Sequence, residues 1–202
     1  MDIMVTEADR TVVAEYLTKN GMSFSTMVEN VQELINMSPI VKGSGNSKQG
    51  HNMDWDSYHP LEDMYSYLDF IEGIKLRNKS WAIYKTTEIL NFPANFDYAS
   101  TEVIGQSFEG TDMRLMKICK DGCGNKPAMW IDGGIHAREW IAHAAVMYMI
   151  KQLTEDVAGQ EDLIDNLDWY ILPCVNPDGY AWTQDPNGDR LWRKTRYLPL
   201  FL

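Results

Sequence analysis

The chain has 202 residues, of which 45% are hydrophobic and 11% aromatic, and this composition excludes a disordered protein and leaves room for one or two domains. Its 18 lysines and arginines against 29 aspartates and glutamates give a net charge of −11, so we expect no nucleic-acid partner. No run of about 18 apolar residues occurs, so we expect no membrane span.

Residues 1–37 predict a small unit with the order strand, helix, strand, helix. The apolar runs and their spacing place these elements at residues 2–5, 12–17, 22–28 and 31–35, with Thr6 as the N-cap of the first helix and Asn20-Gly21 as its stop. So small a unit buries too little surface to be stable alone, and we expect it to pack on a larger domain.

Residues 38–52 predict a linker, because glycines, serines and two lysines, Lys42 and Lys48, alternate there without an apolar period. A second domain is expected to begin near Met53, where Pro60 opens a helix with apolar residues at helical spacing as far as Ile71. Residues 73–98 fit neither helical nor strand spacing, and they include the glycosylation triplet Asn78-Lys79-Ser80.

Strands and one helix alternate in the second half of the chain. The expected strands are residues 102–105, Asp112–Ile118, 128–135 and 169–175, and the expected helix, residues 138–153, is apolar on most faces and should be largely buried. Strand, helix, strand at this spacing is typical of a βαβ crossover. The predicted fold class is therefore α/β, with a mixed, mostly parallel sheet flanked by helices.

Three cysteines allow at most one internal disulfide. Cys119 and Cys123 flank the turn Asp121-Gly122, where they either pair or remain free thiols. Cys174 lies inside an apolar strand, so we expect it to be a buried core residue.

Polar residues gather where two of the predicted strands end, which is where ligands of such a sheet bind. His136 and Glu139 follow residues 128–135, and their spacing lets an imidazole nitrogen and a carboxylate oxygen meet at one zinc ion. The alternative is a glutamate that caps a helix beside a surface histidine. The second exit, residues 176–179, leads to the basic cluster at residues 190–196, which favours binding of a carboxylate or an oxyanion; the alternative is a solvated turn.

Together these segments resemble the A/B-type zinc metallocarboxypeptidases. The similarity lies in residues 133–141 (GGIHAREWI), 176–179 (NPDG) and 191–196 (LWRKTR), with further matches at residues 108–110 and 53–72. It implies the N-terminal half of the zinc carboxypeptidase fold at residues 53–202, with an insertion at residues 73–91. Residues 1–37 resemble the second half of that family's propeptide, a ferredoxin-like α+β prosegment that covers the active site, and residues 38–52 would be the activation linker.

The resemblance implies a secreted zymogen that an activating protease cuts in the linker, and zinc-dependent release of C-terminal residues from peptides or proteins. His136 and Glu139 take the places of the first two zinc ligands. Arg138 matches an arginine of a substrate subsite. Arg193 matches the arginine that polarises the scissile carbonyl and stabilises the oxyanion, and a fixed guanidinium suits charge that develops only in the transition state.

The resemblance also places the third zinc ligand, the general-base glutamate and the clamp for the substrate's terminal carboxylate further along the family sequence than Leu202, and the propeptide's first half before Met1. We therefore expect a chain shortened at both ends, with one zinc ion in an incomplete site and no activity of its own. The alternative is a catalytically silent module that binds peptides or a propeptide-like surface. His143 is considered as a substitute ligand, while His51 and His59 are expected to face solvent.

Overall fold

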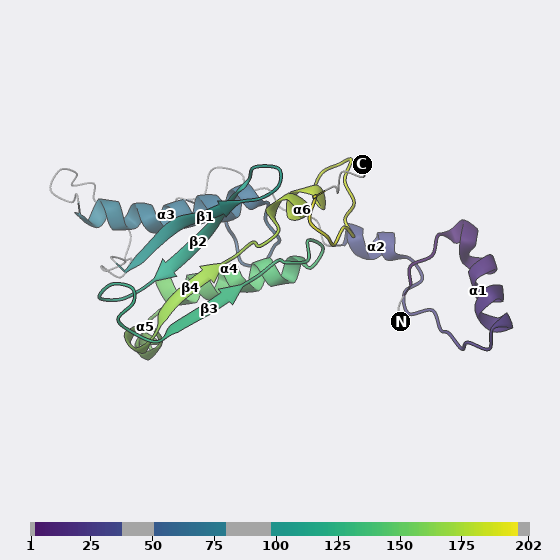
Figure 1. Cartoon of the computed structure of the whole chain (residues 1–202), viewed down its shortest axis with the longest axis horizontal. Coiled ribbons are helices and arrows are strands. Elements are labelled where there is room, and N and C mark those ends of the chain that lie inside the picture. The colour runs from purple at the N-terminus through teal and green to yellow at the C-terminus, as the bar shows by residue number, and fades with distance from the viewer. Residues whose placement is uncertain (1–2, 38–50, 80–97, 198–202) are drawn as a thin grey trace. The chain divides into compact units, whose positions relative to one another are not determined.

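The computed structural model describes residues 3–37, 51–79 and 98–197, and the chain divides into two compact units, Met1–Met37 and Ser38–Leu202 (Figure 1). Among these residues, no helix has the length and apolar character that crossing a membrane requires. Lys42 and Lys48 with most of the expected linker, Ser80 of the glycosylation triplet and most of the expected insertion lie outside the described residues.

The first unit is built from short helices: η1 (Glu7–Asp9), α1 (Arg10–Lys19) and α2 (Val31–Asn36). As predicted, Thr6 is an N-cap, since its hydroxyl accepts a hydrogen bond from Asp9 N. Asn20 is the C-cap of α1, directly before Gly21, which has a φ of 68°. The strands predicted at residues 2–5 and 22–28 are wrong for the described residues, which are neither paired nor buried there. A strand needs a partner for its backbone groups, and local spacing cannot supply one.

Helix α3 (Leu61–Lys79) begins where the sequence predicts it. The carbonyl of Pro60 accepts hydrogen bonds from Asp63 N and Met64 N, so the proline stands directly before the first turn. The helix continues past Gly73, where no element was predicted. Its buried residues Leu61, Met64, Leu68 and Ile71 repeat at helical spacing and form one side of the core.

Four strands form one mixed sheet in the order β1-β2-β4-β3: β1 (Ala99–Gln106), β2 (Asp112–Ile118), β3 (Ala128–Asp132) and β4 (Asp168–Leu172). β1 pairs with β2 and β2 with β4 in antiparallel fashion, and β3 pairs with β4 in parallel. The α/β class, the mixed sheet and the hairpin of the first two strands are confirmed. The expectation of a mostly parallel sheet is wrong for the described strands, since only the pairing of β3 with β4 is parallel and β2 lies antiparallel between β1 and β4.

The βαβ crossover from β3 to β4 runs through α4 (Trp140–Thr154) and α5 (Glu161–Asn166), of which α5 was not predicted. α4 packs on β2 and β4 (Figure 1) and buries Val146, Met147 and Ile150 in the core. Its outer face exposes Ile141 and Tyr148, so the expectation of burial on most faces is wrong. The helix is enclosed where it faces the strands and where Trp140 and His143 pack on Tyr180 of the segment after β4, and the rest of its surface is open.

The cysteines follow one of the two alternatives that the sequence left open. Cys119 and Cys123 form a disulfide across the turn after β2. Cys174 is a free thiol and fully buried, which confirms its predicted place in the core.

Candidate metal and anion site

The two strand exits lie side by side because β3 and β4 are parallel neighbours. Both strands end three residues earlier than predicted, yet their pairing continues through the backbone: Gly133 N donates to Leu172 O (3.0 Å), Val175 N to Gly133 O (2.9 Å) and Asn176 N to Gly134 O (3.2 Å). The structure therefore joins the glycine pair to the NPDG segment, at the sheet edge where the sequence places the site.

The glycine pair lets the loop after β3 lie directly on α4. A Cβ atom at Gly134 would come within 2.0 Å of Nε2 of His143, and one at Gly133 within 2.8 Å of Val146. Gly134 also has a φ of 70°, a conformation that residues with a side chain rarely adopt. A larger residue at either position would push the loop, and with it His136, away from the helix.

Three of the predicted site residues meet at the end of this loop. His136 Nδ1 lies 2.9 Å from Glu139 Oε1 and 3.4 Å from Arg193 Nη2. The backbone fixes the arrangement, because Glu139 N donates to His136 O (3.1 Å) and Ala137 N donates to Arg193 O (3.1 Å). Glu139 is the N-cap residue of α4, but its carboxylate accepts no capping hydrogen bond and faces the imidazole instead. The carboxylate of Glu139 therefore does not serve as the cap of α4 in this structure.

An imidazole nitrogen and a carboxylate oxygen are donors that zinc prefers in proteins, and here they face each other on an accessible loop. The donor chemistry fits zinc. Within the part of the chain that the structure describes, no group of three or more His, Cys, Asp or Glu side chains comes together to hold a metal. The described residues therefore fit two ligands of a zinc site, whereas known catalytic sites use three protein ligands.

The remaining histidines do not extend this pair. His143 is buried in the first turns of α4, where its ring stacks on that of Tyr180 (3.9 Å between centroids) and burial lowers its pKa to about 4. His51 and His59 are both only 3% exposed, so the expectation that they face solvent is wrong. The segment before α3 folds into the core, where His59 Nε2 accepts a hydrogen bond from Asp54 N (3.1 Å).

The basic cluster divides into structural anchors and one arginine at the site. Arg190 donates to Arg138 O (2.9 Å) and lies 3.4 Å over the ring of Trp140. Arg196 pairs with Glu109 (3.2 Å) and lies 4.0 Å over the ring of Trp182. These contacts leave Arg193 exposed beside His136, while Arg138 is exposed next to Glu139.

The sequence did not predict the structural role of the NPDG segment, residues 176–179. It forms the N-terminus of helix α6 (Pro177–Trp182), which was predicted as a turn. The Asn176 side chain caps α6, and the Asp178 carboxylate accepts from Ser107 Oγ (2.5 Å) and Glu109 N (2.9 Å), which fixes the loop between β1 and β2. An asparagine directly before a proline is the local signal that predicts such a helix start.

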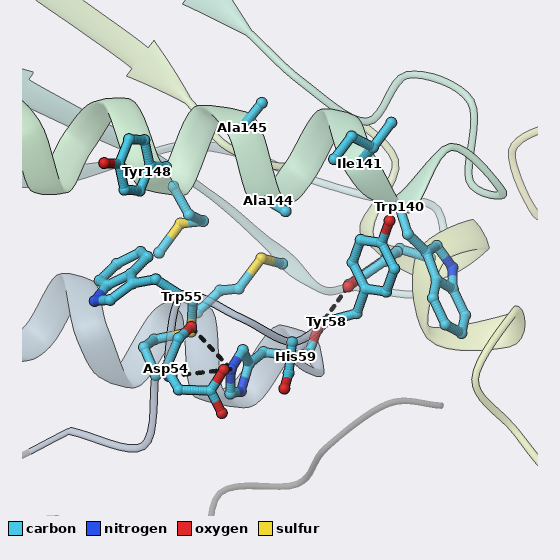
Figure 2. Close-up of a pocket in the computed structure, with 14 residues that line it drawn as sticks. Asp54, Trp55, Tyr58, His59, Trp140, Ile141, Ala144, Ala145 and Tyr148 are labelled. Atoms are coloured by element: carbon cyan, nitrogen blue, oxygen red, sulfur yellow. Dashed lines mark hydrogen bonds and ion pairs between the residues drawn. The ribbon is translucent and has the colours of Figure 1, made fainter. Parts of the chain in front are cut away.

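A cavity of about 240 Å³ lies between α4 and the segment that leads into α3 (Figure 2). Trp55 and Tyr148 pair at one end, with ring centroids 6.1 Å apart, and Tyr58 and Trp140 pair at the other, 5.6 Å apart. Its lining is largely apolar, and neither zinc donor nor Arg193 contributes to it. This cavity is therefore separate from the site that the sequence predicts.

Comparison with known families matches residues 94–199 to the zinc carboxypeptidases and residues 1–38 to the carboxypeptidase activation peptide. The first match covers just over half of the chain and includes both strand exits and the basic cluster. The second covers the short helical unit.

Individual proteins give the same result. Carboxypeptidase B of Astacus astacus is 40% identical over 71% of this chain and 40% of its own length, and carboxypeptidase A1 of Sus scrofa is 31% identical over 97% of this chain and 42% of its own. The crystal structure of carboxypeptidase A from Helicoverpa armigera has a TM-score of 0.72 and 28% identity, and covers 98% of this chain and 44% of that one. The chain thus spans about 40% of the length of the curated relatives it matches.

Proposed function

The chain belongs to the zinc carboxypeptidase family, and we propose that it supplies two zinc ligands and the oxyanion-binding arginine for release of C-terminal residues from peptides or proteins. One observation carries this proposal: Nδ1 of His136 lies 2.9 Å from the carboxylate of Glu139 and 3.4 Å from the guanidinium of Arg193. Two metal donors and a cation for an anionic oxygen are thereby gathered at one strand exit.

His136 and Glu139 would hold the zinc ion. Zinc, when bound, supplies Lewis-acid chemistry to the scissile peptide carbonyl. The exposed guanidinium of Arg193 donates hydrogen bonds to the carbonyl oxygen as negative charge develops on it, so this contact is strongest in the transition state. We assign Arg138, which is exposed one residue before Glu139, to a subsite for the peptide substrate.

The match of residues 1–38 to an activation peptide supports a zymogen. We assign residues 1–37 to a partial propeptide, residues 38–52 to a linker cut by an activating protease, and residues 53–202 to the N-terminal half of the catalytic domain. The family resemblance favours secretion as the route by which such a zymogen meets its protease and its peptide substrates.

We further propose that the polypeptide of residues 1–202, studied alone, binds zinc weakly and does not turn over substrate, because the described residues supply two protein ligands. The alternative function is a catalytically silent module that binds peptides or a propeptide-like surface. The exposure of Arg138 and Arg193 beside the zinc donors favours this alternative, since both side chains are available to carboxylates without a metal.

Equilibrium dialysis against zinc tests the metal site. We expect weak retention that a mild chelator removes and that both His136→Ala and Glu139→Gln abolish. Glu62→Gln is the matched control, because it makes the same change on the exposed side of α3. Retention that survives His136→Ala would remove His136 from the site and contradict the proposal.

A further inference from the structure

Asn176 occupies a buried junction between three segments, and its side chain is fully engaged. It is 3% exposed and follows β4 as the N-cap of α6. Its Nδ2 donates to Lys194 O (2.9 Å) and to Ile135 O (3.4 Å), and its Oδ1 accepts from Gly179 N (3.0 Å). A Cβ atom at Gly179 would lie 2.5 Å from Nδ2, so the glycine leaves the space that this amide fills.

The two carbonyls that Asn176 binds belong to the direct neighbours of two site residues. Ile135 precedes His136, and Lys194 follows Arg193. Ile135 and Lys194 are 41 and 18 residues away from Asn176 in the chain. One amide group therefore connects two loops that are far apart in the sequence. The hydrogen bond from Ala137 N to Arg193 O (3.1 Å) connects the same two loops beside it.

Helix capping alone does not account for an asparagine here. Capping of α6 uses only the Oδ1 acceptor, and aspartate or serine provides that acceptor about equally well. The amide NH₂ group is what distinguishes asparagine, and both of its hydrogens point at loop carbonyls. Its contribution is therefore to the position of the two loops.

We propose that Asn176 is a positioning residue that holds the Arg193 loop against the His136 loop through its side-chain NH₂ group. This inference rests on the function proposed above, in which the 3.4 Å distance between Arg193 Nη2 and His136 Nδ1 places the guanidinium beside the zinc donors. A guanidinium fixed before the reaction needs no reorganisation when charge develops on the carbonyl oxygen. Asn176 itself touches neither substrate nor metal in this account.

Two substitutions separate the donor from the cap. Asn176→Asp keeps the size and the acceptor for Gly179 but removes the NH₂ group. Asn176→Ser removes the NH₂ group without adding a charge and keeps a capping oxygen on a smaller side chain. If the buried carboxylate of Asn176→Asp unfolds the chain, the result for Asn176→Ser is the one that tests the proposal. Asn125→Asp is the matched control, because Asn125 also donates from Nδ2 to two carbonyls, those of Asp121 and Gly122, in an exposed turn before β3.

Amide hydrogen exchange reports the contact between the loops without any metal. In both Asn176 variants we expect exchange at Ala137 to accelerate by about tenfold or more, because two hydrogen bonds that support it are lost. Exchange at Val175, whose amide bonds to Gly133 across the paired strand exits, should change by less than about twofold, as should Ala137 in the control. Exchange at Ala137 that stays at the wild-type rate in Asn176→Ser would overturn the proposal.

Cobalt(II), used as a paramagnetic probe for the zinc site, reports the position of Arg193. We expect cobalt bound through His136 and Glu139 to broaden the Arg193 side-chain resonance in the wild type, and this broadening to fall in Asn176→Ser while cobalt affinity is retained. A merely structural role would lower both together. If cobalt affinity is unchanged in His136→Ala, the proposed function is refuted. The exchange rate at Ala137 still tests the role of Asn176 in that case. Unchanged broadening in Asn176→Ser would refute the positioning role alone.

Discussion

At Gly134 two separate constraints act on one residue: a φ of 70° and the ring of His143, 2.0 Å from where a Cβ atom would lie. We expect Gly134→Ala to lower the free energy of unfolding by about 2–4 kcal/mol, from backbone strain and a steric clash together. Gly159→Ala isolates the strain, since Gly159 has a φ of 82° and nothing within 4 Å of its Cβ position.

Urea unfolding measures both variants. The effect of Gly134→Ala should shrink in a His143→Ala background, because the clash is then relieved. Equal losses for Gly134→Ala and Gly159→Ala would show that the contact with His143 is unimportant.

The buried imidazole of His143 makes stability depend on pH. Burial lowers its pKa from 6.5 to about 4, so the folded state favours the neutral ring. This contribution is fully present above pH 6.5 and is lost as the pH falls through 6.5 towards 4. We expect the wild type to lose about 2–3 kcal/mol more than His143→Gln between pH 7 and pH 4.5 in urea unfolding. Parallel losses in both proteins would contradict a neutral buried His143.

Among the site residues, the meeting of His136 with Glu139 is predictable from a local signal, whereas Arg193, 57 residues from His136, was predicted only through the family resemblance. His136 and Glu139 are three positions apart at a strand exit, so their meeting follows from the fold of one loop. Asn176 was missed as a junction because its partners are 41 and 18 residues away. His51 and His59 were assigned to solvent because their burial depends on how the segment before α3 folds against the core, which no short pattern records.

The turn between β2 and β3 is held by covalent and polar contacts together. Beside the disulfide, Gly124 N donates to Asp168 Oδ2 (2.7 Å) and Lys126 Nζ to Lys120 O (2.7 Å) and Ile164 O (3.0 Å). We expect the double variant Cys119→Ser/Cys123→Ser to lose about 2 kcal/mol of unfolding free energy, the chain-entropy value for so short a loop.

Thermal unfolding with and without a reductant checks this expectation. Reductant should lower the wild-type Tm and leave the double variant unchanged. If reductant does not change the Tm of the wild type, the polar contacts alone stabilise the turn.

Element boundaries show the limit of apolar patterns. The apolar runs of β3 and β4 continue three residues beyond the strands, because the exits stay paired through the backbone while bending over α4. The turn-forming residues of NPDG instead start α6, since proline suits a first helical position as well as a turn. Strands expected in residues 3–37 lack partners there, and pairing is a property that spacing along one segment does not contain.

For the whole molecule, the sequence predicts the layers better than the strand order. A helix between two apolar strands dictates the parallel pair β3–β4 and its covering helix. The insertion of β2 between β1 and β4 depends on contacts such as Met116 with Ile171, which are remote in the chain. The start of the site is less affected, because the His136 loop and the NPDG segment directly follow the two strands of this parallel pair, whereas the Arg193 loop follows α6 and joins them through the hydrogen bond from Ala137 N to Arg193 O.

Activity is the prediction that belongs to the whole chain. The polypeptide of residues 1–202, with zinc added, should not release C-terminal Phe or Arg from blocked peptides above the His136→Ala background. In enzymes that use one, loss of the general base alone costs about 10²–10⁴-fold in rate. On the proposed site of two protein ligands, the metal would be weakly held and the substrate would be poorly oriented. Arg193 does not compensate, since an oxyanion partner lowers the barrier only when a nucleophile is already in place. Turnover that His136→Ala abolishes would show instead that this chain completes a working site from its own residues.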